Sequence, residues 1–189
     1  MTSVQKRPPI SGPYAAPLFL AVLMFCLAIG LTAQPRSSID ELEGLYRYTF
    51  KNGLMNGQKY ESENRLALLK LTATSAYFNT HLEWANGHTC DLSGVADLDP
   101  NGNLIFRQPS IEGRICVFSI KPTRDGLVLG DEGGACRLIS CGARGRISGV
   151  EFKFQGRGKL HADEIRKSRD FERAVEEHQH PPSGSAPHQ

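Results

Sequence analysis

Hydrophobic and polar residues alternate along most of the chain between residues 45 and 154, in short runs that turn-forming residues separate. Alternation with a period of two is typical of strands that bury one face. Dipeptides such as Asn86-Gly87 and Asp125-Gly126 lie between the runs and tolerate the positive φ of tight turns. The predicted strands cover residues 45–50, 65–71, 74–84, 88–98, 104–107, 114–120, 127–129 and 146–154.

The spacing of these strands decides between the fold classes. No long helical pattern separates one predicted strand from the next, so the crossovers that a parallel sheet needs are missing. Short strands at even spacing are typical of small antiparallel barrels and of sandwiches. We therefore predict an all-β domain over residues 34–158, a small antiparallel barrel in preference to a sandwich.

The C-terminal part of the chain departs from this pattern. Residues 159–178 are rich in charge and carry Leu160, Ile165 and Phe171 as a helical stripe, which predicts a short charged helical tail. Residues 179–189 are rich in Pro and Ser and are predicted to be disordered.

The N-terminal segment has the layout of an export signal. Lys6 and Arg7 precede an apolar run at residues 18–31, and Ala33 supplies the small residue expected at a cleavage site. The run is shorter than the roughly 20 residues with which a helix crosses a bilayer. We predict a signal peptide at residues 1–33, with an uncleaved membrane anchor as the alternative. In either case the domain is periplasmic or secreted, and membrane contact is expected only without cleavage.

The cysteine count supports an exported protein. One of the five cysteines, Cys26, lies inside the predicted signal peptide. The remaining four are Cys90, Cys116, Cys136 and Cys141. In an oxidising compartment they are expected to form two disulfides, with three possible connectivities. We favour a bridge between Cys90 and Cys116, on neighbouring predicted strands. The second bridge, from Cys136 to Cys141, would close a short loop. The alternative is a zinc site in which His88 joins the thiolates.

The most distinctive stretch of sequence is a glycine-rich segment with charges at both ends, residues 131–146. A loop of this kind that is fixed by a disulfide loses little entropy when it binds a partner. We therefore predict partner binding by Asp131, Glu132, Arg144 and Arg146.

Two segments resemble known protein families. Gly44-Leu45-Tyr46 follows a predicted helical turn and resembles the Gly-x-Trp start of lipocalins, with Tyr46 in place of the tryptophan. In that family the aromatic residue plugs one end of an eight-stranded barrel, which implies a carrier of a small apolar ligand. Residues 87–154, with Cys-Gly-Ala-Arg-Gly at 141–145, resemble uncharacterised exported bacterial proteins, some linked to lysozyme-inhibitor-type domains. This resemblance supplies no catalytic residues.

Charge and motifs restrict the function further. Lys6 and Arg7 account for the whole net charge of +2, so the exported part is neutral and lacks the positive field of nucleic-acid-binding proteins. No nucleophile elbow, phosphate loop or zinc-protease helix occurs, and no cofactor, metal or catalytic residue is predicted. His81 and His88 are acid–base candidates only in the sense that every histidine is one.

We predict an exported, non-enzymatic protein that binds a protein partner, with inhibition of a cell-wall hydrolase such as lysozyme as its particular form. Two alternatives remain open: a lipocalin-like carrier of a small apolar ligand, and a structural protein of the cell envelope.

Overall fold

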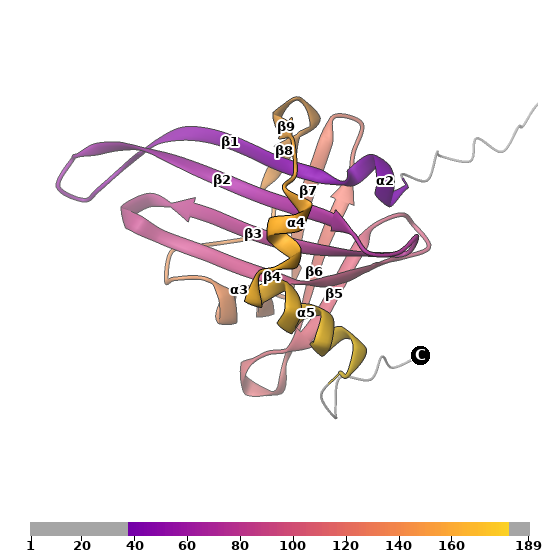
Figure 1. The fold of residues 1–189 in the computed structure, drawn as a ribbon. Coiled ribbons are helices and arrows are strands. Elements are labelled where there is room, and N and C mark those ends of the chain that lie inside the picture. The colour runs from indigo at the N-terminus through magenta and orange to yellow at the C-terminus, as the bar shows by residue number, and fades with distance from the viewer. Residues whose placement is uncertain (1–37, 182–189) are drawn as a thin grey trace, which may run out of the picture. The chain divides into compact units, whose positions relative to one another are not determined.

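A computed structural model describes residues 38–181, and it shows a nearly closed barrel of nine antiparallel strands. The strands are β1 Gly44–Gly53, β2 Lys59–Lys70, β3 Ser75–Trp84, β4 His88–Leu98, β5 Leu104–Pro109, β6 Ile115–Pro122, β7 Gly126–Glu132, β8 Glu151–Lys153 and β9 Arg157–Gly158. Each of the first eight pairs with its neighbour in sequence (Figure 1), which confirms the predicted antiparallel barrel.

Short helices and single turns complete the described part of the chain. They are α2 Ile39–Leu42, η1 Ala85–Gly87, η2 Ile111–Gly113, α3 Ala135–Ser140, η3 Phe154–Gly156, α4 Ala162–Arg166 and α5 Arg169–Gln179. No helix within residues 38–181 is long and apolar enough to cross a membrane. The predicted signal peptide at 1–33 lies outside the described residues, as does the predicted disordered end from residue 182 onward.

The first hairpin is longer than its sequence pattern predicted. Asn52 and Gly53 belong to β1, and the turn lies at Gly57, whose φ of 87° suits a residue without a side chain. The side chain of Asn52 is almost fully buried and donates a hydrogen bond to Ser62 Oγ at 3.0 Å. Asn52 therefore extends the strand by pairing with β2, although Asn-Gly dipeptides usually mark turns.

One short segment closes the barrel. β8 pairs with β7, η3 reverses the chain, and β9 then pairs with β1 through Leu45 and Tyr46. Gly156 allows this close approach, because a Cβ there would lie 2.5 Å from the carbonyl oxygen of Arg47. β9 covers only the beginning of β1, so the rest of β1 has no ladder partner on that side in the described chain. This gap between β1 and β8 is called the seam.

Side chains fill the barrel interior. Phe78 is completely buried, and its ring lies 4.7 Å from that of Phe118 and 5.2 Å from that of Phe106. One end of the barrel is closed by α2, whose Ile39 and Leu42 are buried in the same core. Alternating inward positions along the strands supply the core, as the hydrophobic pattern requires.

Tyr46 connects α2, which closes one end of the barrel, to strand β1. Its buried hydroxyl donates a hydrogen bond to the carbonyl oxygen of Leu42 at 2.8 Å. Burial raises the pKa of the Tyr46 hydroxyl, and the hydrogen bond and charge of Arg157 act in the opposite direction. The Arg157 guanidinium also donates to the carbonyl oxygen of Glu41, so both ends of the domain hold α2 in place.

The ladder between β4 and β5 is very short. Only Asp97 with Ile105 and Leu98 with Leu104 form pairs, and beyond these residues the two strands separate. The Phe106 ring fills part of the space, because Gly94 opposite it has no side chain; a Cβ there would lie 2.4 Å from the ring. The barrel therefore has a split between β4 and β5.

The C-terminal helices pack on the outside of the barrel. Figure 1 shows α4 and α5 lying across β3 and β4. Ala174 is buried against Leu69, Tyr77 and Val95, and the ring of Phe171 lies 5.1 Å from that of Tyr77. The short helix predicted after the β domain is confirmed, in two pieces.

Candidate functional site

The two disulfides lie at the end of the barrel opposite α2, and their connectivity differs from the favoured one. The bridges join Cys90 with Cys141 and Cys116 with Cys136. The predicted pairing of Cys90 with Cys116 is wrong because β5 separates their strands, β4 and β6. The predicted bridge between Cys136 and Cys141 is also wrong. These cysteines lie at opposite ends of α3, and each bonds to a strand cysteine instead.

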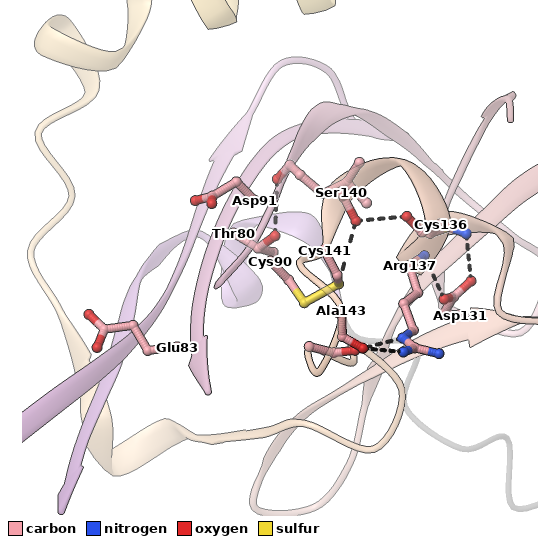
Figure 2. Close-up of a disulfide and its surroundings, with 12 residues drawn as sticks. Thr80, Glu83, Cys90, Asp91, Asp131, Cys136, Arg137, Ser140, Cys141 and Ala143 are labelled. Atoms are coloured by element: carbon pink, nitrogen blue, oxygen red, sulfur yellow. Dashed lines mark hydrogen bonds between the residues drawn. A yellow bond between two sulfur atoms is a disulfide. The ribbon is translucent and has the colours of Figure 1, made fainter. Parts of the chain in front are cut away.

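The disulfides fasten α3 across the split in the barrel, and Figure 2 shows the Cys90–Cys141 bridge. α3 contacts both β4 and β6. Cys141 pairs with Cys90 in an isolated antiparallel bridge, and the amide of Gly142 donates to the carbonyl oxygen of Thr89 at 2.9 Å. The chain after α3 thus occupies the place beside β4 that β5 leaves empty. All four thiols are bonded, so the alternative zinc site has no thiolate ligand. Two disulfides in one small domain indicate folding in an oxidising compartment.

Asp131 anchors the start of α3. Its two carboxylate oxygens accept hydrogen bonds from the backbone N–H groups of Cys136 and Arg137, each at 2.9 Å. These amides belong to the first turn of the helix, which has no intrahelical partners for them. The sequence predicted Asp131 as a partner-binding residue, and this stays a prediction; the structure shows that its carboxylate also fixes the start of α3.

Arg137 fixes the loop that follows α3. Its Nε donates to the carbonyl oxygen of Gly145 and its Nη2 to that of Ala143, both at 2.7 Å. Gly145 packs directly against the Cys90–Cys141 bridge, because a Cβ there would lie 2.5 Å from Cys90 Sγ. Sequence reasoning missed Arg137, since nothing in its local sequence shows that its side chain turns back toward later carbonyls. Residues 141–150, the stapled loop, are therefore held by covalent and polar contacts.

Replacement of Arg137 should loosen the stapled loop. We expect Arg137→Met to lower the free energy of unfolding by about 1–2 kcal/mol, because two charge-assisted hydrogen bonds are lost. Amide hydrogen exchange within residues 142–146 should accelerate in the same variant. The matched control is Arg144→Met, in which an exposed arginine without a partner in the described part of the chain is replaced, and a change below about 0.5 kcal/mol is expected. Equal effects of both variants would contradict the stabilising role of the two Arg137 hydrogen bonds.

The structure divides the four predicted binding residues between different surfaces. Arg144 is exposed on the stapled loop and makes no ion pair or side-chain hydrogen bond within residues 38–181. Arg146 is exposed, and its guanidinium lies over the ring of Trp84 at 5.3 Å. Asp131 and Glu132 instead line a cleft on the outer face of β5–β7, with a volume of about 640 Å³.

An exposed apolar patch lies beside the stapled loop, and sequence reasoning missed it. It is formed where η2, the beginning of β6 and α3 meet, and Ser110 Oγ ties η2 to α3 through the carbonyl oxygen of Ala135. The exposed fractions are 37–48%, large for aliphatic side chains. The members of this apolar patch are Ile111, Ile115, Leu138 and Ile139. Alternation along β6 places Ile115 on the face opposite the buried residues Cys116, Phe118 and Ile120, but local sequence does not show that this face stays uncovered here.

A second cleft opens at the seam, with a volume of about 700 Å³. Because β9 leaves most of β1 uncovered, side chains of the inner barrel face are reached there from outside. Two of these are Tyr48, which is 39% exposed, and Trp84, at the end of β3. The side chains that line this seam cleft include Arg47, Tyr48, Trp84, Arg146, Glu151 and Lys153.

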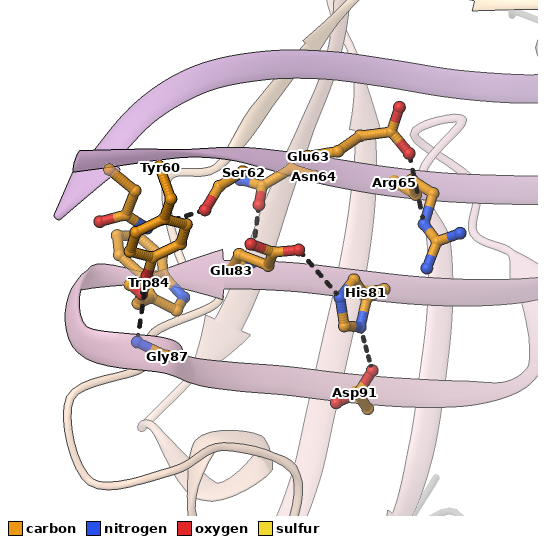
Figure 3. Close-up of polar contacts among 11 residues, drawn as sticks. Tyr60, Ser62, Glu63, Asn64, Arg65, His81, Glu83, Trp84, Gly87 and Asp91 are labelled. Carbon is orange, nitrogen blue, oxygen red and sulfur yellow. Dashed lines mark hydrogen bonds and ion pairs between the residues drawn. The ribbon is translucent and has the colours of Figure 1, made fainter. Parts of the chain in front are cut away.

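The outer face of β2–β4 carries a polar network around His81 (Figure 3). Its Nδ1 lies 2.6 Å from Asp91 Oδ1, and its Nε2 lies 3.6 Å from Glu83 Oε1. Each ring nitrogen therefore faces a carboxylate, Glu83 on the same strand and Asp91 on the neighbouring strand β4. His88 lies at the start of β4 beside Gly142, where a Cβ would come within 3.0 Å of the imidazole. Neither histidine faces a nucleophilic side chain in the contacts of the described chain.

Comparison of the chain with protein-family models, with curated proteins and with solved structures finds no match.

Proposed function

We propose that this chain is an exported, non-enzymatic binding protein that holds a protein partner at the stapled end of its barrel. The observation that carries the proposal is the apolar patch beside Arg144, which has no partner among residues 38–181, on a loop that the Cys90–Cys141 bridge fixes. Exposed aliphatic clusters of this kind mark protein-binding surfaces. The predicted signal peptide and the oxidised cysteines support a periplasmic or secreted location.

The rigidity of this surface favours binding. α3 is covalently joined to both sides of the split, and Arg137 and Asp131 fix the segments around it. A surface that is ordered before it meets a partner loses little conformational entropy on association. The patch would supply the desolvated centre of the interface, and Arg144 would supply charge at its rim.

The particular form that we propose is inhibition of a cell-wall hydrolase such as lysozyme. Glycoside hydrolases carry a pair of carboxylates beside the scissile bond, so their clefts are acidic. Arg144 is exposed and uncompensated, and a rigid arginine-bearing loop is electrostatically complementary to such a cleft. The loose resemblance of residues 87–154 to proteins linked with lysozyme-inhibitor-type domains supports the same form.

An inhibition assay with the intact exported domain tests this proposal. We expect lysozyme inhibition at micromolar concentrations, and at least tenfold weaker inhibition by Leu138→Asp and by Arg144→Ala. The matched controls are Met55→Asp, which changes an exposed apolar residue of the β1–β2 turn, and Arg124→Ala, which removes an exposed arginine near the α2 end. Both controls should inhibit within twofold of the unchanged domain. Absence of inhibition by the intact domain would overturn the hydrolase form, and equal losses in the controls would overturn the assigned surface.

The other two functions have less support. A carrier of a small apolar ligand needs an internal cavity, whereas the central interior holds packed rings of Phe78, Phe106 and Phe118. A structural role in the envelope would leave the disulfide-fixed loop without a specific task.

A further inference from the structure

The seam cleft has a chemical character of its own, separate from the apolar patch. Three cationic side chains line it, and the single carboxylate, that of Glu151, is already paired with Lys153 at 3.0 Å. Arg47 reaches only a distant partner, Glu63, at 4.0 Å. Arg146 has no carboxylate partner in the described part of the chain. The cleft therefore has a positive excess, although the exported chain as a whole is neutral.

Hydrogen-bond donors in the cleft lack acceptors. Trp84 Nε1 is buried and has no hydrogen-bond partner among residues 38–181. The hydroxyl of Tyr48 accepts a hydrogen bond from Asn64 Nδ2 at 2.7 Å, which leaves its own proton free to be donated. Buried donors without partners are rare in proteins because each costs free energy, and such a group needs an explanation. An acceptor-rich ligand in the cleft would satisfy the Tyr48 hydroxyl, whereas Trp84 Nε1 is closed off from solvent.

The aromatic side chains of the cleft are held in place. Trp84 packs against the core, and Arg146 lies over its ring. The neighbours of Arg146 in the chain, Gly145 and Ile147, are both buried, so the backbone of Arg146 is fixed beneath its exposed guanidinium. Gly149 also lines the cleft, and a Cβ built there meets no atom within 4 Å.

We propose that the seam cleft binds a short stretch of carboxylate-bearing polysaccharide. A sugar ring offers an apolar C–H face to the exposed ring of Tyr48, whose hydroxyl donates to the oxygens of the sugar. The Arg146 guanidinium binds the carboxylate in a bidentate manner. The volume of about 700 Å³ lies within the range of small-ligand sites and suits a short segment of chain. This site is independent of the proposed protein-binding surface.

Trp84 provides a direct probe of this cleft, because it is the only tryptophan in the chain. We would titrate the intact exported domain with a galacturonic acid trimer and follow tryptophan emission. The methyl-esterified trimer, which keeps the sugar rings but loses the charges, serves as the matched ligand. We expect a saturable emission change with the acid and at least tenfold weaker binding of the ester. No saturable change with the acid, or equal binding of the ester, would overturn the proposal.

Variants and a third ligand complete the test. Arg146→Gln should weaken binding of the acid at least tenfold, whereas Arg169→Gln, which changes an exposed arginine of α5 on the outside of β3 and β4, should leave it unchanged. Leu138→Asp should also leave it unchanged, which separates this site from the apolar patch. Tyr48→Phe keeps the stacking ring but loses the hydroxyl donor, and calorimetry should show several-fold weaker binding. Equal or tighter binding of an oligothymidylate would mean general attraction of polyanions and would overturn the sugar assignment.

Discussion

The double substitution Cys90→Ser/Cys141→Ser is expected to lower the free energy of unfolding by about 4 kcal/mol, the larger of the two disulfide effects. The bridge closes a loop of 51 residues, compared with 20 for Cys116–Cys136, so it restricts the unfolded chain more strongly. The corresponding loss for Cys116→Ser/Cys136→Ser is about 3 kcal/mol. Denaturant unfolding followed by circular dichroism measures both.

The two variants serve as controls for each other, because each leaves one bridge and the same core. Mass spectrometry of the non-reduced protein should first confirm the connectivity, with peptides that contain Cys90 and Cys141 linked. Loss of this bridge should also speed amide exchange in β4 beside the split, where β5 gives no support. If Cys116→Ser/Cys136→Ser proves the more destabilised variant, restriction of the unfolded chain is not the dominant effect.

Phe78→Ala is expected to cost about 3–5 kcal/mol of unfolding free energy. Phe78 is completely buried and its ring contacts those of Phe106 and Phe118, so truncation leaves a cavity in the centre of the barrel. Thermal or denaturant unfolding of the purified domain measures the change.

The matched control for the core is Ile115→Ala, which truncates a side chain that is 42% exposed. Its effect should stay below about 0.5 kcal/mol. A cost of less than about 2 kcal/mol for Phe78→Ala would contradict a packed interior. Such a result would strengthen the alternative of a small-ligand carrier, since a loosely filled barrel has room for a guest.

The strand pattern of the barrel could be predicted from sequence wherever alternation and turn residues agree. β3 and β4 occupy almost the predicted ranges, because residues such as Phe78 and Leu82 alternate with polar ones and Asn86-Gly87 marks the turn. The predicted last strand, residues 146–154, shortens to Glu151–Lys153. Ile147 and Val150 are buried at the end of the barrel, and Gly149 adopts a φ of 80°. The alternation at these positions therefore belongs to a loop that covers the core and not to a strand.

α3 and the disulfide pairing could not be predicted, for related reasons. The helix has no capping side chain next to it in sequence; Gly134 stands at its N-cap with a φ of 70°, and Asp131 supplies the hydrogen bonds from farther back. Its stability depends on bonds to β4 and β6, which local sequence does not show. Counting cysteines gave the right number of bridges, but choosing partners requires knowledge of which strands are adjacent.

The sequence predicted the exposed placement of two arginines, whereas their binding role stays a prediction. Arg144 and Arg146 do project from a loop that disulfides fix, as the glycine-rich sequence indicated. The apolar patch and the seam cleft depend on which strand edges stay uncovered, a property of the assembled sheet. Trp84 gives no functional signal in sequence, because an aromatic residue at the end of a strand usually belongs to the core.

The closing segment also constrains how the chain reaches its native state. β9 is the last strand in sequence, and its partner β1 is the first. β8 and β9 occupy the two edges of the sheet. A nascent or truncated chain that stops before Glu151 would expose two unpaired strand edges, which are templates for self-association. We therefore expect productive folding to be completed only after synthesis of the whole domain, because the pairing of β9 with β1 joins residues from the two ends of the sheet's sequence.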